Sequence, residues 1–439
     1  MIENAKLKTV EPPILAGESS LVRIKLAAIK NPDMAFTSIA HRIDLHLLKR
    51  SYREITKSKS TGVDKISAKE YSENLDRNLF DLYTRLIQGK YKTCPVKRIW
   101  IDKEGGKKRP IGIPALEDKI VQKAVAILMT MIFDENFYDF SYGFRTGFNQ
   151  HMAIHQIRES CYANRVNWIV SADITGLFDN IDHTLLMEMI KKRVSDGTIL
   201  KLIGKWLKAG VFENGSVSFS DKGTPQGGVI SPVLSNIFLH YVLDDWLFKT
   251  VGKYMKGKWF VIRYADDFIL GFESKDDALK VMKVLPKRFN KFGLELHPEK
   301  TQMIPFGKPT RAHKGKGLLT FDFLGFTFYW GKSLKGNWII KKKTIGKRLR
   351  RSMARIWEWC KENRHANMIE QYKALSAKLR RYYQYYGVRG NYKSIEAVYD
   401  HVYKAWRYWL CRRGSKKTVF FDKLKKEFVL PKPRIVHNI

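Results

Sequence analysis

The sequence predicts an α+β fold, in which strands and helices alternate through the middle of the chain and helices dominate both ends. Short runs of aromatic and β-branched residues, such as WFVIRY (259–264) and FILGF (268–272), indicate strands. Apolar residues at helical spacing, as in HTLLMEMIKKRV (183–194), indicate amphipathic helices. The chain has 439 residues and is 44% hydrophobic and 13% aromatic, which is enough for two or three apolar cores.

The N-terminal third is predicted to be an arm followed by helices and a hairpin. Residues 1–37 carry no clear periodic pattern, so we expect an extended or mobile arm there. Residues 38–90 have helical periodicity, broken at 57–67 by a polar, glycine-containing stretch that indicates a loop and then a capped helix. Two short strands around a Gly-Gly turn are expected in 96–114, and a long helix in 116–133.

The middle of the chain alternates between the two types of element. The two runs around 259–272 predict a hairpin with a carboxylate pair, Asp266 and Asp267, at its tip. The other expected elements are a buried strand at 166–174, helices at 183–194, 232–247 and 275–296, and a strand at 321–330. From Lys341 onward the pattern indicates only helices and loops.

The charge of the chain predicts a polyanionic partner. There are 80 Lys and Arg residues against 43 Asp and Glu, which gives a formal net charge of +37. Nucleic acid is favoured over a membrane, because no apolar run approaches the roughly 18 residues of a membrane span and no signal peptide is visible. The four cysteines lack the spacing of a zinc site or a disulfide framework, so we expect a reducing, cytoplasmic setting.

The positive charge is concentrated at the C-terminal end. From Gly331 onward there are 29 Lys and Arg residues against 7 Asp and Glu. A solvated helical surface is one interpretation. The stretch 380–417 favours RNA or DNA binding instead, because its cations alternate with Tyr and Trp, which stack on unpaired bases. The cations expected to contact nucleic acid are Arg380, Arg381, Arg407, Arg412, Arg413, Lys416 and Lys417.

A third acid joins the pair at the hairpin tip. Asp173 ends the strand VNWIVSAD, so it can meet Asp266 and Asp267 if the strands are neighbours in one sheet. Two-metal phosphoryl transfer needs such a set of carboxylates, which hold two divalent ions about 3.5–4 Å apart. A single Asp at a strand end is more often a turn or cap residue, and only the surrounding motifs reverse that interpretation.

The order of these motifs resembles that of reverse transcriptases encoded by group II introns. YADD (264–267), SADITGLFDNIDH (171–183) and GTPQGGVISPVLSNIFL (223–239) are similar to the central polymerase motifs of that family. Further blocks match in order: KKRPIGIP (107–114), SYGFRTGFNQHMAI (141–154), HPEKTQMI (297–304) and FLGFTF (323–328). Seven ordered blocks are far more specific than YADD alone. The segments LRRYYQYYGVRGN, WRYWLCRRG and LPKPRI resemble the maturase domain of such proteins.

The resemblance implies a right-hand polymerase: fingers and a palm with an antiparallel sheet, followed by an all-α thumb and maturase domain. It implies an N-terminal extension and fingers over 38–170, with palm strands interleaved, and a palm over 171–330. A basic, RNA-binding thumb and maturase domain would occupy 331–439. Relatives often end in a zinc-binding endonuclease, and no such pattern follows LPKPRI, so an endonuclease-less type is expected.

The resemblance also implies roles for individual residues. Asp173, Ile174, Asp266 and Asp267 would hold two Mg²⁺ ions, with Mn²⁺ as a substitute, and the three acids would be catalytic. Gly176 makes the motif after Asp173 flexible, but the metal and sugar positions are intact.

Four residues match positions that bind the incoming deoxynucleotide. Lys103 and Arg109, on the strands around the Gly-Gly turn, would hold its triphosphate. Phe178 would stack under the sugar and exclude a 2′-hydroxyl, and Gln226 would lie against the nucleotide and template. Without the resemblance, the two cations would be taken as solvent-facing and Phe178 equally well as an ordinary core residue. Arg263 and Tyr264 are assigned only to packing and primer contact.

Two functions from different classes follow from these observations. The first is an RNA-directed DNA polymerase that extends a primer with deoxynucleotides on an RNA template. The second is a maturase that clamps a structured group II intron RNA and helps it splice, with little polymerase role. A reverse transcriptase recruited to antiphage defence or CRISPR adaptation is a further alternative. The expected partners are an RNA template and primer, intron RNA, deoxynucleotides and a DNA product or target, and no membrane.

Overall fold

A computed structural model of the chain describes residues 16–55, 60–102, 108–224, 227–310, 319–413, 424 and 426–439. Four of the residues predicted to bind nucleotide or nucleic acid lie outside these described ranges. They are Lys103, Gln226, Lys416 and Lys417.

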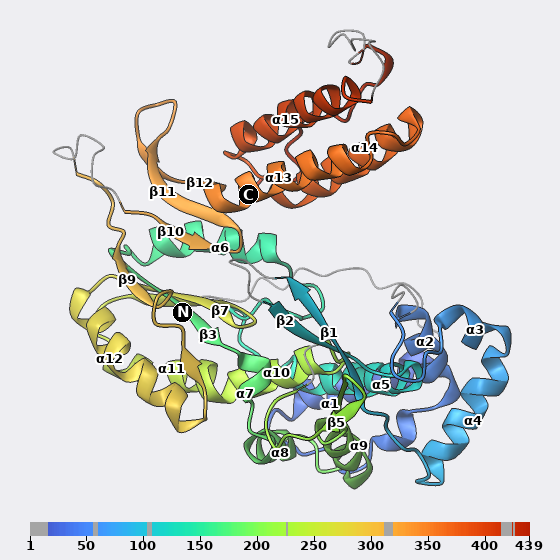
Figure 1. The fold of residues 1–439 in the computed structure, drawn as a ribbon. Coiled ribbons are helices and arrows are strands. Elements are labelled where there is room, and N and C mark those ends of the chain that lie inside the picture. Colours follow the sequence, from blue (N-terminus) through green and yellow to red (C-terminus); the bar gives the residue numbers. More distant parts are fainter. Residues whose placement is uncertain are drawn as a thin grey trace.

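Five helices make up the N-terminal part of the molecule (Figure 1). They are α1 (Ala16–Lys30), α2 (Leu45–Ile55), α3 (Ala68–Glu73), α4 (Leu75–Ile87) and α5 (Leu116–Phe133). The predicted bounds of α5 are confirmed, and this helix is buried on most of its circumference. The predicted cap after the 57–67 loop is also confirmed. Ser67 and Glu70 form a capping box at the start of α3, in which each side chain accepts a hydrogen bond from the other's backbone N–H.

The prediction of an extended or mobile N-terminal arm is wrong for residues 16–30, which form α1. Leu21, Ile24 and Ala28 of this helix are buried in the main apolar core. Their spacing of three and four residues places them on one helical face. Because that face packs against α5 and its surroundings, residues 16–30 are part of the globular fold.

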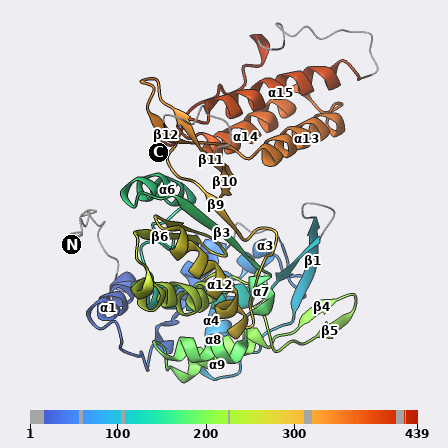
Figure 2. The ribbon, with the colours of Figure 1, turned by 90° about the vertical axis from the view of Figure 1, so that its left-hand side faces the viewer.

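A small sheet projects beside these helices (Figure 2). It contains β1 (Val96–Asp102), β2 (Lys108–Ile113), β4 (Val211–Glu213) and β5 (Ser216–Ser218), in the order β2-β1-β4-β5. The predicted hairpin of 96–114 is confirmed as the antiparallel pair β1–β2. The parallel pairing of β1 with β4 joins it to a second hairpin.

An antiparallel sheet lies at the centre of the molecule. It is formed by β3 (Trp168–Thr175), β6 (Trp259–Tyr264), β7 (Asp267–Phe272), β8 (Glu295–Leu296) and β9 (Gln302–Pro305). The order is β6-β7-β3, with β8 and β9 both paired to β3. Successive side chains face opposite sides: Phe268 and Leu270 belong to the main core, whereas Ile269 belongs to a second cluster. Both faces of the sheet are therefore covered.

Helices α10 (Ser231–Leu239) and α12 (Lys275–Lys291) pack on one side of this sheet, and α6 (Gln150–Ala163) covers the other. The predicted helix 232–247 is present but interrupted. A π-helical segment, η3 (His240–Asp244), separates α10 from α11 (Asp245–Lys249). Single π turns are frequent at functional sites, and this one presents Asp244 to the sheet.

The C-terminal part differs from the predicted pattern. Instead of one strand at 321–330, there is a hairpin of β10 (Phe321–Phe323) and β11 (Phe326–Lys332), and β12 (Trp338–Thr344) completes a three-stranded sheet. The boundary expected at 330/331 therefore falls inside β11, and the all-helical region begins only after Thr344. The three helices that follow are α13 (Gly346–Glu362), α14 (Met368–Tyr386) and α15 (Tyr392–Leu410).

These three helices have their own apolar core, which contains Leu375, Leu379, Val402 and Trp406. Figures 1 and 2 both place them above the central sheet, with β10–β12 and α6 between. The remaining elements are α7 (Leu177–Asn180), α8 (His183–Lys191), α9 (Gly197–Leu207), and the 3₁₀ helices η1 (Ala40–Arg42) and η4 (Val251–Tyr254). Within the described part of the chain, no helix is both long and apolar enough to cross a membrane.

Candidate active site

The central sheet brings the three predicted acids together. Asp173 of β3 lies directly opposite Asp267 of β7 in the antiparallel register. Tyr264 of β6 pairs with the same Asp267, so Ala265 and Asp266 form a two-residue hairpin loop. The predicted placement of the acid pair at a hairpin tip, beside the strand that carries Asp173, is therefore confirmed, although β3 continues past Asp173 to Thr175.

The hairpin tip is held by tight backbone packing. Ala265 adopts a φ of 56°, a conformation that costs a non-glycine residue free energy. The loop stays in place because Gly143 packs directly against it: a Cβ at position 143 would lie 2.4 Å from the backbone nitrogen of Ala265. Only glycine allows this approach.

Arg263 supports the same loop from inside the protein. Its side chain is fully buried, and its guanidinium donates to both carboxylate oxygens of Asp244, at 2.8 and 2.5 Å. It also donates to the Asn236 side chain at 3.0 Å and to the Ala265 carbonyl at 3.3 Å. The predicted contact of Arg263 with nucleic acid is wrong, because every polar group of this side chain faces the interior. Tyr264 is half-buried, and its primer contact stays a prediction.

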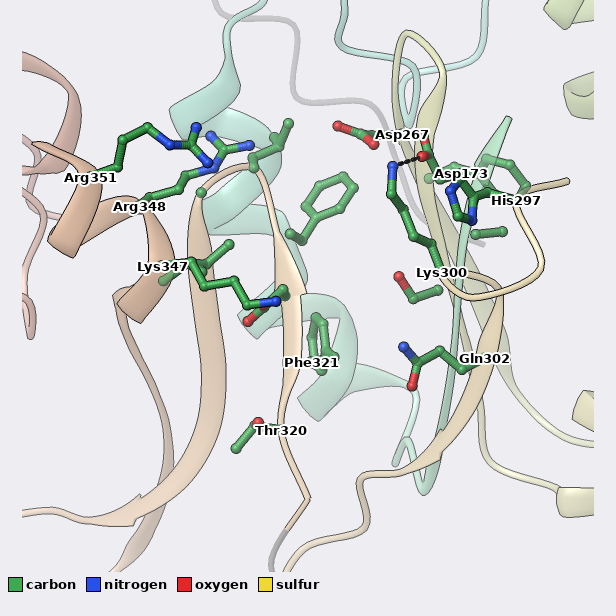
Figure 3. Close-up of a pocket in the computed structure, with 18 of the residues that line it drawn as sticks. Asp173, Asp267, His297, Lys300, Gln302, Thr320, Phe321, Lys347, Arg348 and Arg351 are labelled. Atoms are coloured by element: carbon green, nitrogen blue, oxygen red, sulfur yellow. Dashed lines mark hydrogen bonds and ion pairs between the residues drawn. The ribbon is translucent and has the colours of Figure 1, made fainter. Parts of the chain in front are cut away.

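A cleft of about 1270 Å³ opens in front of the acids (Figure 3). Asp173 and Asp267 lie on one wall, and the opposite wall is α13 with the loop between β10 and β11. Arg109 of β2 lines the cleft as the nucleotide role requires. The cations that line the cleft are Arg109, Lys300, Lys347, Arg348, Arg351 and Arg355.

Lys300 is the direct partner of Asp173. Its ammonium group forms an ion pair with the Asp173 carboxylate (Figure 3). The chain between these residues folds back at His297, whose backbone N–H donates to the Asp173 carbonyl at 2.8 Å, and whose own carbonyl accepts from the Lys300 N–H at 3.2 Å. The motif HPEK contains both His297 and Lys300, but neither residue was assigned a role from the sequence alone.

The carboxylates repel one another in a poorly solvated place. Burial, and then the charges of Asp266 and Asp173, together raise the pKa of Asp267 to about 7. The pKa of Asp266 is also raised, mainly by burial and then by Asp173, although Arg109 and Lys300 oppose the shift. Burial and mutual repulsion therefore disfavour the charged forms of Asp266 and Asp267, and a bound divalent cation would oppose both effects.

The donor set fits a hard divalent cation. Three carboxylates supply only oxygen ligands, which Mg²⁺ prefers, and the side chain of Ile174 is buried, so only its backbone could contribute. Within the described residues, no group of three or more His, Cys, Asp or Glu side chains is already arranged to hold a metal ion. Because Asp173 is paired with Lys300, binding of a cation would require that ammonium to move away.

Of the remaining predicted nucleotide contacts, Phe178 is within the described residues, and it is not part of the cleft lining. Phe178, in α7, is buried but belongs to none of the three apolar clusters of the described residues. Its carbonyl accepts a hydrogen bond from Thr224 at 2.6 Å, just before Gln226. Gly227, directly after Gln226, approaches β2 so closely that a Cβ would lie 2.5 Å from the Gly112 carbonyl oxygen. The roles of Phe178, Gln226 and Lys103 stay predictions.

The cations of α13 were missed by the sequence prediction. Lys347, Arg348, Arg351 and Arg355 recur at helical spacing in GKRLRRSMAR and face the cleft. The spacing was a readable signal, because residues three or four apart share one helical face.

The cations predicted from the basic, aromatic C-terminal stretch divide into two groups. Arg380, Arg381, Arg407 and Arg412 are exposed on α14 and at the end of α15. Arg412 also lies over the ring of Tyr408, 3.5 Å from its centroid. Arg413 instead donates to the carbonyl groups of Arg364 and Ala366, in the loop between α13 and α14, so much of its hydrogen-bonding capacity serves the fold.

Comparisons with known proteins point in one direction. A family model described as reverse transcriptase (RNA-dependent DNA polymerase) matches residues 101–328. Protein YkfC of Escherichia coli (strain K12) is 35% identical over an alignment that covers 50% of this chain and 66% of that protein. The group II intron-encoded protein LtrA of Lactococcus lactis subsp. cremoris is 30% identical, covering 74% of this chain and 62% of LtrA.

A yeast protein extends the match over most of the chain. The putative COX1/OXI3 intron 1 protein of Saccharomyces cerevisiae is 26% identical, over 89% of this chain and 54% of its own length. The chain thus spans between about half and two thirds of the length of these relatives.

Proposed function

The chain belongs to the reverse transcriptase family of group II intron-encoded proteins, and we propose that it is an RNA-directed DNA polymerase that extends a primer with deoxynucleotides. The observation that carries this proposal is that Asp173, Asp266 and Asp267 lie together at one end of the central sheet, where Asp173 and Asp267 line a cleft that also contains cations. A protein that only binds nucleic acid has no need for three mutually repelling carboxylates in one place.

The parts of a right-hand polymerase can be assigned on this basis. The central sheet with α6, α10 and α12 would be the palm, and β1–β2 with the N-terminal helices would be the fingers and extension. Helices α13–α15 would be the thumb and maturase domain. The template and primer would then lie in the cleft between the acids and α13, where Arg348, Arg351 and Arg355 meet their phosphates.

The residues of the chain bind and orient the reactants in this proposal. Arg109, on the β1–β2 hairpin, neutralises the triphosphate of the deoxynucleotide, together with Lys103. The hairpin loop fixes Asp266 and Asp267 opposite Asp173, so that the primer 3′-hydroxyl and the α-phosphate meet at one point. Two Mg²⁺ ions held by these acids would lower the pKa of that hydroxyl and stabilise the charge on the pyrophosphate that leaves.

Primer extension on a defined RNA template tests the proposal. The wild type is expected to make DNA with Mg²⁺, and Asp266→Ala is expected to lose synthesis while keeping its affinity for the template and primer. Arg98→Ala, on β1 but outside the cleft lining, serves as a control for general damage. Synthesis by Asp266→Ala at the wild-type rate would place the metal site elsewhere.

A second function, intron RNA binding as a maturase, is favoured by a different observation. Arg380, Arg381 and Arg412 are exposed on α14 and after α15 and do not line the cleft, so polymerisation does not explain them. Replacing these three with alanine is expected to lower affinity for structured intron RNA. The matched control removes Lys283, Lys287 and Lys291, three exposed cations of α12. An equal loss of RNA affinity in both triple variants would show that only the net charge of the protein matters.

A further inference from the structure

The end of α14 is hydrogen-bonded to the wall of the cleft. The hydroxyl of Tyr385 donates to the carbonyl oxygen of Leu324 at 2.9 Å. Leu324 and Gly325 form the two-residue loop between β10 and β11, in which Phe323 pairs with Phe326. Their φ angles are 45° and 85°. Such a loop suits glycine or asparagine at both positions, so Leu324 is held in a conformation that it rarely adopts by itself.

The Leu324–Gly325 loop is part of the cleft lining. Leu324 and Gly325 line the cleft together with Asp267 and the first cations of α13. A Cβ at Gly325 would lie 3.1 Å from the Arg348 guanidinium and 3.3 Å from the Tyr386 hydroxyl. A strand that ends at the carboxylates and contacts Arg348 would therefore lie close to this loop.

Tyr385 is itself fixed from several sides. His151 of α6 donates from Nε2 to the Tyr385 carbonyl at 2.8 Å, and the Tyr385 ring stacks on Phe326 at 13° between ring planes. The buried Asn391 side chain donates to the Tyr386 carbonyl at 2.9 Å and to the Thr344 hydroxyl at 2.8 Å. These contacts fix the end of α14 against the β10–β12 sheet. The helix end can therefore determine the position of the Leu324–Gly325 loop.

We propose that Tyr385 is a positioning residue for the primer: its hydroxyl fixes the strained Leu324–Gly325 loop, and through that loop the α13–α15 helices set where the primer 3′ end lies relative to the acids. This inference rests on the proposed polymerase function and deepens it. It assigns to a helix outside the reaction centre a direct influence on the geometry of the reaction.

Replacing Tyr385 with phenylalanine removes the hydroxyl and keeps the ring. The matched control is Tyr383→Phe, on the same helix, because the Tyr383 hydroxyl also donates to a backbone carbonyl, that of Pro431, at 3.1 Å, away from the cleft. Two properties are measured on a preformed template and primer complex. One is the rate and nucleotide affinity of a single incorporation. The other is the fluorescence of 2-aminopurine at the primer 3′ end, which needs no catalysis.

Tyr385→Phe is expected to lower the incorporation rate about two- to tenfold, as the loss of one hydrogen bond allows, with unchanged nucleotide affinity. It should also change the fluorescence of the primer end. Tyr383→Phe should change neither, with a similar loss of thermal stability. Equal behaviour of the two variants, or wild-type rate and fluorescence in Tyr385→Phe, would overturn the inference. If the wild type incorporates nothing, the polymerase proposal fails, and the fluorescence comparison still decides whether Tyr385 positions the primer.

Discussion

Asp267 has the most strongly shifted pKa among the residues that line the cleft. Burial, then Asp266 and Asp173, raise its pKa from 3.8 to about 7. In the protein without divalent ions, this carboxyl therefore keeps its proton up to about pH 7, whereas the unfolded chain releases it near pH 4. The folded state binds more protons between these values, so this group stabilises it at low pH, and that contribution is lost as the pH rises to 7.

The same shift predicts how metal affinity depends on pH. A cation that binds Asp267 must displace the proton, so Mg²⁺ affinity should rise up to tenfold per pH unit below about pH 7 and level off above it. Calorimetric titration with Mg²⁺ between about pH 6 and pH 8 measures this dependence. Asp267→Asn cannot release that proton, so its affinity should be weak and nearly independent of pH. A pH-independent affinity in the wild type would contradict the assignment of Asp267 as a ligand.

Phe178 offers a test of sugar selection. Its ring is buried outside the three apolar clusters of the described residues, which suits a surface that a nucleotide covers. Phe178→Ala is therefore expected to admit ribonucleotides in a primer-extension assay. Leu177→Ala is the control, because Leu177 is buried in the main core and should cost about 2–5 kcal/mol of stability without changing sugar preference. A purely structural Phe178 would behave like Leu177.

At the level of residues, the sequence predicts the acids but not every cation. Asp173, Asp266 and Asp267 could be found because the motifs around them, SADITGLFDNIDH and YADD, resemble those of a known polymerase family. A carboxylate at a strand end would not have been enough by itself. Arg263 was misassigned because its partner, Asp244, lies 19 residues away on a π-helical turn that no local pattern reveals. Lys300 reaches Asp173 only through pairing of distant strands.

The β6–β7 hairpin depends on groups behind it. Arg263 joins Asp244, Asn236 and the Ala265 carbonyl, and Asn236 in turn donates to the Gly143 carbonyl at 2.6 Å. This network and the Gly143 contact hold Ala265 in its left-handed conformation. The position of the acids is therefore set by buried polar groups that never touch a substrate.

Removing Arg263 should accordingly damage the fold. Arg263→Ala leaves the buried Asp244 carboxylate unpaired, which is expected to cost about 3–5 kcal/mol of unfolding free energy. Arg109→Ala, an exposed cation of β2, should change stability by less than about 0.5 kcal/mol. Urea unfolding of both variants measures the difference. Normal stability together with weakened primer binding in Arg263→Ala would restore the original interpretation of this residue.

At the level of elements, long periodic segments were predicted best. Helix α5 has the expected bounds because apolar residues recur at helical spacing along its whole length. The segment 321–330 was misjudged because the hairpin loop is Leu-Gly rather than Asn-Gly, and Leu324 gives no sign of a positive φ. Strand β12 was missed because Lys341, Lys342 and Lys343 look like a helical charge run, although Lys342 is buried and donates to the Ile439 carbonyl.

The whole molecule places its two charged surfaces across one cleft. The acids lie on the central sheet, and α13 presents its cations from the opposite wall (Figure 3). A polyanion in this cleft would meet the cations of α13 on one wall and the carboxylates of the reaction centre on the other. The net charge of +37 adds a long-range attraction that salt screens.

The salt dependence of binding should identify the wall that contacts phosphates. Arg348→Ala with Arg355→Ala removes two cations that line the cleft, and each lost phosphate contact should reduce the slope of log affinity against log salt by about one. The control removes Arg350 and Lys361, which belong to the same helix but do not line the cleft. Fluorescence anisotropy with a template and primer duplex measures both slopes. Identical slopes would show that α13 attracts the duplex only through its net charge.

The most direct test of the central claim is the incorporation of one deoxynucleotide into a preformed complex of RNA template and DNA primer, started by adding Mg²⁺. Wild type and Asp173→Asn are compared, since asparagine keeps the size of the side chain but not its charge. The account predicts Mg²⁺-dependent extension by the wild type and none by Asp173→Asn, with equal affinity of both for the duplex. Extension at the same rate by both proteins would contradict it.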